Sequence, residues 1–112
     1  MFYQSRFNGD ISKWDVSNVT NMLYMFAYSV FNKDIGKWNV SRVTNMASMF
    51  AYSIFNSNIG AWNVSKVTNM ETMFASADFD RDISKWKVQA RVIKLMFIKS
   101  PLESNPPAWY KK

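Results

Sequence analysis

Large apolar residues recur along this chain at a nearly constant spacing of 24 positions. Every Trp, Phe and Met falls into one of a few columns with that period. The columns are Trp14, Trp38, Trp62, Trp86 and Trp109; Phe7, Phe31, Phe55, Phe79 and Leu102; Phe2, Phe26, Phe50, Phe74 and Phe97; Met1, Met25, Met49, Met73 and Met96; and Met22, Met46 and Met70. Such a period is the signature of repeated units that stack on one another.

The repeat divides the chain into units that we expect to form one domain. The units cover residues 1–24, 25–48, 49–72 and 73–95, and a closing segment covers 96–112. So short a unit cannot bury its own apolar side, so stacking must supply the core, with the Trp column inside it. Pro101, Pro106 and Pro107 cannot donate to a further backbone ladder. With Lys111 and Lys112 they predict a C-terminal cap at 96–112.

The hydrophobic pattern within each unit predicts one short strand and one short helix. Trp14 and Val16 alternate with polar neighbours, which is typical of a strand with one buried face. Apolar residues between 19 and 26 then recur at the spacing of one helix face, and Ser17 or Thr20 can cap that helix. A strand and a helix in every unit predict an α/β fold, a right-handed leucine-rich-repeat-like solenoid with a parallel sheet.

Polar residues follow the same period. The column of Asp10, Asp34, Asn58 and Asp82 predicts Asx-type turns, with a calcium ladder as the alternative. The column of Asn21, Asn45 and Asn69 predicts an amide ladder between neighbouring units, and the column of Thr20, Thr44 and Thr68 predicts helix caps. The fourth unit is one residue shorter, and we expect Ile93 to take the place of Met22 there.

The composition excludes much of the chemistry that enzymes use. The chain has neither Cys nor His, so it lacks the commonest nucleophile, general base and metal ligands. It also lacks a phosphate-binding glycine loop and any metal-ligand spacing. We therefore expect no enzymatic activity, no cofactor and no metal.

The excess of basic residues is the feature with the clearest functional meaning. Fourteen Lys and Arg against eight Asp and Glu give a net charge of +6. Strand alternation places a row of cations on the outer face, and the candidate partner-binding residues are Lys13, Lys37, Arg42, Lys66 and Lys85. The partner that this row favours is another protein with an acidic surface. The row can also serve only to solvate the surface, or it can bind nucleic acid or another polyanion, although no exposed aromatic platform is evident.

The repeat resembles a known family. The segments W-D-V-S-N-V-T-N-M at 14–22, M-F at 25–26 and F-N-K-D-I at 31–35 are similar to the motif of BspA-type leucine-rich-repeat surface proteins of bacteria. The resemblance implies a non-catalytic protein–protein interaction module at the cell surface or secreted, acting in adhesion or host contact. A cytoplasmic location stays open because residues 1–6 lack the apolar core of a signal peptide. No apolar run reaches the length of a membrane span.

The N-terminal end is the second candidate interaction surface. Residues 1–2 already belong to a repeat, so the first unit has no polar cap of its own. The candidate self-association residues are Phe2, Phe7, Ile11, Trp14 and Val16. They predict either that further repeats precede this segment or that the first units of two chains meet about a two-fold axis as a homodimer.

Overall fold

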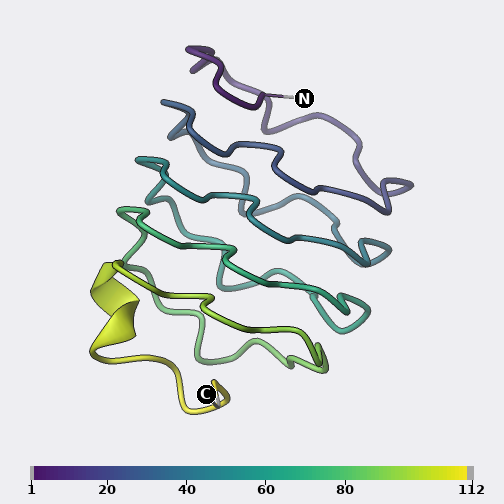
Figure 1. Ribbon diagram of the computed structural model, residues 1–112. Helices are drawn as coiled ribbons and strands as arrows, with labels where there is room; N and C mark the ends of the chain where they lie inside the picture. Colours follow the sequence, from purple (N-terminus) through teal and green to yellow (C-terminus); the bar gives the residue numbers. More distant parts are fainter. Residues whose placement is uncertain (1, 111–112) are drawn as a thin grey trace.

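Backbone hydrogen bonds between residues about one repeat apart join successive coils of the chain. In the computed structural model, which describes residues 2–110, the coils lie one below the next from the N-terminus to the C-terminus (Figure 1). The N–H groups of Met22, Tyr24, Phe26 and Tyr28 donate to carbonyl oxygens 23 positions later, at 2.8–3.1 Å. The stack is compact, with principal extents of 34 × 26 × 20 Å. Met1, Lys111 and Lys112, which the sequence placed in a column and in the cap, lie outside the described residues.

The same pattern of hydrogen bonds repeats down the stack. We call the five stretches that carry it the ladder segments. They cover residues 2–5, 22–29, 46–53, 70–77 and 93–100. The spacing falls to 22 positions at the fourth coil, where the Met70 N–H donates to the Val92 carbonyl at 2.7 Å. The Met96 N–H donates to the Ile93 carbonyl as Met73 does to Met70, so Ile93 takes the place of Met22 as predicted.

The predicted α/β solenoid is wrong. Residues 2–110 contain a single helix, the 3₁₀ helix η1 at Pro101–Glu103, and no extended strand. In place of a parallel sheet, isolated parallel bridges join Asn21 to Asn45, Asn45 to Asn69 and Asn69 to Val92. The observed fold is a compact stack of irregular coils joined by backbone hydrogen bonds.

Consecutive tight turns replace the predicted helix. In the second ladder segment the N–H groups of Met25, Ala27 and Ser29 donate to the carbonyl three residues earlier, at 3.1–3.2 Å. The backbone angle φ is 59° at Tyr24 and 58° at Tyr28, in the left-handed region that interrupts a right-handed helix. Every ladder segment has such residues, namely Gln4, Tyr24, Tyr28, Ser48, Tyr52, Thr72, Ser76, Leu95 and Lys99. The intervening N–H groups are therefore free to donate to the next coil.

Two Asx turns replace the predicted strand. The Asp10 carboxylate accepts from the Ser12 N–H at 2.9 Å, and the Asp15 carboxylate accepts from the Ser17 N–H at 3.0 Å. Asp34, Asn58 and Asp82 accept in the same way in the later coils, so the predicted Asx turns are confirmed. Each turn bends the chain where an extended strand would have continued.

The core consists of stacked aromatic columns. The rings of Phe26, Phe50, Phe74 and Phe97 follow one another with centroids 5.6, 5.7 and 5.8 Å apart, nearly parallel. Trp38, Trp62 and Trp86 are buried, and Trp109 is half-buried. The prediction that all five Trp rings lie inside is wrong for Trp14, which is 45% exposed because no coil lies above it within the described residues.

Hydrogen bonds along the Trp column fix each indole to the coil before it. The Nε1 of Trp38 donates to the Ile11 carbonyl at 3.0 Å, and that of Trp62 donates to the Ile35 carbonyl at 2.9 Å. Trp86 and Trp109 repeat the bond to Ile59 and Ile83. A buried indole N–H requires such a partner, so the bond determines how each ring sits in the stack.

The amide ladder occurs in a different column from the one predicted. Asn21, Asn45 and Asn69 accept only from the N–H two residues later in their own coil. The column of Asn8, Asn32 and Asn56 forms the ladder instead, since each side-chain oxygen accepts from a backbone N–H 24 positions later at 2.8 Å. The predicted Thr caps are also wrong, because Thr44 and Thr68 donate to the carbonyl of the preceding Thr and no helix follows them.

Candidate functional site

The residues of the predicted basic row are all exposed. Lys13, Lys37 and Lys85 occupy one column of the repeat, whose third member is Ala61. Lys66 is exposed, whereas the guanidinium of Arg42 donates to the Asn18 side chain in the coil above. The sequence therefore predicted the accessibility of the row, although the strand that was expected to orient it does not form.

Four exposed tyrosines form a surface that the sequence did not predict. We call it the tyrosine face, and it consists of Tyr3, Tyr24, Tyr28 and Tyr52, which are 47–56% exposed. Tyr3 lies edge-on to both Tyr24 and Tyr28, with centroids 5.8 Å apart in each pair. Tyr28 and Tyr52 stack at 4.7 Å with an angle of 8° between their planes. The rings thus form one continuous patch across three ladder segments.

A groove continues from the tyrosine face along the stack. Its volume is about 310 Å³. Ala51 and Ala75 are buried between two columns that line the groove. One column contains the exposed Tyr24 and the half-buried Ser48 and Thr72, and the other contains the exposed Tyr28 and Tyr52. The groove exists because the ladder segments point residues 24 and 28 outward and the small side chain between them inward. Ile98 and Lys99 line its far end.

The groove offers hydrogen-bonding groups as well as apolar surface. The Thr72 hydroxyl donates to the Glu71 carbonyl at 2.7 Å, and the Ser48 and Thr72 hydroxyl oxygens are 2.6 Å apart. Since the proton of Thr72 is used, Ser48 donates to Thr72 and keeps its lone pairs for a ligand. The four tyrosines of the face are exposed, so their hydroxyls can form hydrogen bonds with a partner too.

The sequence carries only a weak signal for this surface. Tyr28 and Tyr52 are one repeat apart, but their column continues with Ser76 and Lys99. Tyr24 shares its column with Ser48, Thr72 and Leu95. The columns that contain these tyrosines change residue type from coil to coil. The apolar columns that keep their residue type predict the core, so they give no signal for this surface.

The acidic side chains serve the turns. Hydrogen bonds from Ser12 lower the pKa of the exposed Asp10 carboxyl, and the bond from the backbone N–H has the largest effect. Hydrogen bonds from Ser17 and Ser84 likewise lower the pKa values of the Asp15 and Asp82 carboxyls, and there the bond from the serine hydroxyl has the largest effect. In the part of the chain that the structure describes, no three acidic side chains come together as a metal site requires.

The predicted self-association residues divide into two groups. Trp14 and Phe7 are exposed, and the half-buried Phe2 ring packs against both, with centroids 5.8 Å and 4.9 Å away. Ile11 and Val16 are buried, with only 2% and 6% of their surface exposed, so they cannot contact a partner. We call Phe2, Phe7 and Trp14 the end cluster.

Comparison with known proteins identifies a family but indicates no activity. A family model described as "Mycoplasma protein of unknown function, DUF285" matches residues 1–109. No curated protein and no solved structure matches the chain. No helix within residues 2–110 is long and apolar enough to cross a membrane.

Proposed function

The chain belongs to the DUF285 family, and we propose that it is a non-catalytic protein-interaction domain of a bacterial surface or secreted repeat protein. The observation that carries the proposal is the tyrosine face. Exposed tyrosines that touch one another are unusual on a surface that stays in water, and Tyr is among the residues enriched where proteins bind each other. The sequence resemblance to BspA-type surface proteins supports adhesion or host contact as the role.

The backbone ladder makes this surface suitable for binding. The backbone N–H groups of Tyr24, Tyr28 and Tyr52 themselves donate to carbonyls of the next coil. Rings on such a framework lose little conformational freedom when a partner docks, which lowers the cost of association. The groove beside the rings can accept an apolar side chain of the partner, and Ser48 can accept a hydrogen bond from it.

The basic row supports a partner with an acidic surface. Lys13, Lys37 and Lys85 are exposed, and the net charge of +6 attracts acidic proteins from a distance. Arg42 and Lys66 belong to the same proposed contact. Binding to a polyanion is the alternative, and its salt dependence distinguishes it, because contacts with phosphate or sulfate groups weaken steeply as salt rises.

Self-association through the end cluster is part of the proposal. Trp14 exposes nearly half of its surface beside the exposed Phe7 ring. Two copies that met end to end about a two-fold axis would cover both clusters and close the contact.

Binding of the fluorescently labelled full chain to cultured epithelial cells tests the proposed function. We expect saturable binding that falls at least about tenfold in the Tyr28→Ser/Tyr52→Ser double variant, since two stacked aromatic side chains in an interface centre contribute that much. The Val30→Ser/Ile54→Ser double variant is the matched control. Those side chains are also exposed, also one repeat apart and outside the groove. Equal loss in both double variants would refute a role for the tyrosine face.

Charge reversal separates steering by the basic row from contact with the tyrosine face. The triple variant Lys13→Glu/Lys37→Glu/Lys85→Glu should slow association and leave dissociation nearly unchanged. A heparin titration at two salt concentrations provides the control for the alternative. A steep loss of heparin binding with salt, together with unchanged binding of the tyrosine variants to cells, would identify a polyanion-binding protein.

A further inference from the structure

The last ladder segment carries a row of backbone donors that have no acceptor within residues 2–110. In the ladder segment at 46–53, the N–H groups of Met46, Ser48 and Phe50 donate to the next coil at 2.9 Å. The equivalent residues of the last ladder segment are Ile93, Leu95 and Phe97. Within the described residues their N–H groups have no acceptor. Such a row can bind a further segment of backbone that follows the same turns.

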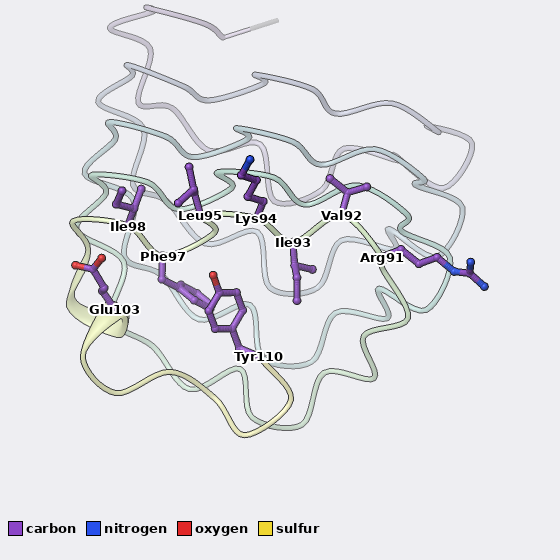
Figure 2. Close-up of a pocket in the computed structure, with 9 residues that line it drawn as sticks. All are labelled: Arg91, Val92, Ile93, Lys94, Leu95, Phe97, Ile98, Glu103 and Tyr110. Carbon is purple, nitrogen blue, oxygen red and sulfur yellow. The ribbon is translucent and has the colours of Figure 1, made fainter. Parts of the chain in front are cut away.

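A cavity lies directly beside these donors. Its volume is about 690 Å³, and Ile93, Leu95 and Phe97 all line it. Figure 2 shows the side chains of Ile93 and Phe97 pointing into the space below the last coil, with the Tyr110 ring closing it at Phe97. Tyr110 and Phe97 meet edge to face, with centroids 5.0 Å apart. The cavity is therefore the part of a fifth coil's position that the C-terminal segment leaves empty.

The C-terminal segment covers the other columns of the last coil. Trp109 stacks on Trp86 at 6.2 Å, and its Nε1 donates to the Ile83 carbonyl at 2.9 Å. The Lys99 N–H donates to the Glu103 carboxylate at 3.2 Å, which satisfies the fourth donor of the ladder. Of the four donors, those of Ile93, Leu95 and Phe97 are left without an acceptor within the described residues. The equivalent donors at 46–50 are satisfied by residues 69–73, so a segment of about five residues in the same turns would suffice.

We infer that this edge binds a short segment of a partner protein that adopts the same turns as residues 69–73 and in which an apolar residue is followed by an acidic one. The partner's carbonyl groups would accept from the N–H groups of Ile93, Leu95 and Phe97. Its apolar side chain would fill the cavity beneath Ile93. Its acidic side chain would lie beside the exposed Lys94.

The register comes from the chain itself. Residues 69–73 lie under the ladder segment at 46–53 in just this way, with carbonyls of Asn69, Glu71 and Met73 as the acceptors. Glu71 and Lys94 occupy the same column in consecutive coils. A further segment in the same register would therefore bring the residue after its apolar one next to Lys94, where a carboxylate is favoured.

A partner protein fits this edge better than a second copy does. In the register of the stack, a second copy that docked with its first coil would bring Leu23 into the column of Lys94. Leu23 is apolar and offers no carboxylate for Lys94. Ile98 borders both cavities, but Ile93, Leu95 and Phe97 do not line the groove beside the tyrosine face, so the two proposals can fail independently.

Nuclear magnetic resonance on the ¹⁵N-labelled full chain tests the inference. The probe is the peptide of residues 69–73, N-M-E-T-M, acetylated and amidated. We expect saturable shifts at Ile93, Leu95 and Phe97 below about 1 mM peptide, which is a weak but specific affinity. Their amide hydrogens should exchange quickly in the free chain and slow severalfold when the peptide binds, whereas those of Thr72 and Phe74 should be protected throughout.

A charge swap gives the matched control. The exposed variant Lys94→Glu should bind the peptide at least about fivefold more weakly and should prefer the peptide in which Lys replaces Glu. Slow amide exchange at Ile93 and Leu95 in the free chain would overturn the inference. An absence of chemical-shift changes at about 1–5 mM peptide would overturn it too, because that range is on the order of the weakest specific dissociation constants. Shifts that grow with protein concentration alone would identify a second copy as the occupant and also overturn it.

Discussion

The middle and the ends of the stack place the same sequence motif in different surroundings. Trp62 is 3% exposed and donates to a carbonyl of the coil above it. Trp14 occupies the same position in the repeat, yet it is 45% exposed and has no such acceptor within the described residues. The comparison teaches that burial in a repeat is supplied by the neighbouring coils and not by the motif itself.

The largest expected effect is on stability in the middle of the stack. Trp62→Ala should lower the free energy of unfolding by roughly 3–5 kcal/mol, because it removes a buried ring and leaves the Ile35 carbonyl without its donor. Trp14→Ala should cost less than Trp62→Ala by about 1 kcal/mol or more, since nearly half of its surface is already in water and its N–H has no acceptor within the described residues. Urea unfolding followed by circular dichroism measures both. Equal losses at the two positions would contradict the comparison.

The next effect concerns the exposed end. If two copies meet through the end cluster, Trp14→Ser should shift the monomer–dimer equilibrium toward monomer by about tenfold or more, because a central aromatic ring is lost from the contact. Light scattering across a concentration series measures the shift. Leu23→Ser, which removes a similarly exposed side chain outside the end cluster, is the control. A wild-type chain that stays monomeric at high micromolar concentration would refute the contact.

The inward and outward positions of the fold could be predicted from the sequence. The period of the repeat identified the residues that face inward in each coil, including Met22, Met46 and Met70, and the Asx column identified the turns. Both follow from residue type and spacing, which a sequence states directly.

The path of the backbone could not be predicted in the same way. A helix and a series of tight turns bring the same spacing of apolar residues to one side, so periodicity does not distinguish them. The turns need a positive φ at Tyr24 and Tyr28. Glycine is the residue that predicts a positive φ, and neither position holds one. The tyrosine face was missed for a related reason, because it depends on which way those turns point the side chains.

The smallest expected effect is a difference in acid sensitivity between coils. In one turn column the first coil uses Asp15, whereas the second and third coils use Asn39 and Asn63. In the other column Asp10 and Asp82 serve the first and fourth coils, and Asn58 serves the third. A carboxylate loses its acceptor role when it is protonated, while an amide does not titrate. Acid should therefore loosen the carboxylate turns first.

The sign of the effect follows from the pKa shifts. The pKa values of Asp10, Asp15 and Asp82 are lowered in the folded chain from the usual value of 3.8. The stabilisation is therefore fully present above that value and is lost as the pH falls through the folded pKa. Protection of the Ser12, Ser17 and Ser84 amide hydrogens should decrease between pH 5 and about pH 2.5, relative to intrinsic exchange rates.

The amide turns provide the internal control for this measurement. Gly60 and Ser65 donate to Asn58 and Asn63, so protection of their N–H groups should hold over the same range. The triple variant Asp10→Asn/Asp15→Asn/Asp82→Asn should keep all the turns and abolish the difference between coils, because Asn already serves this role elsewhere in the chain. A triple variant that still lost protection at Ser12 in acid would show that another group titrates there.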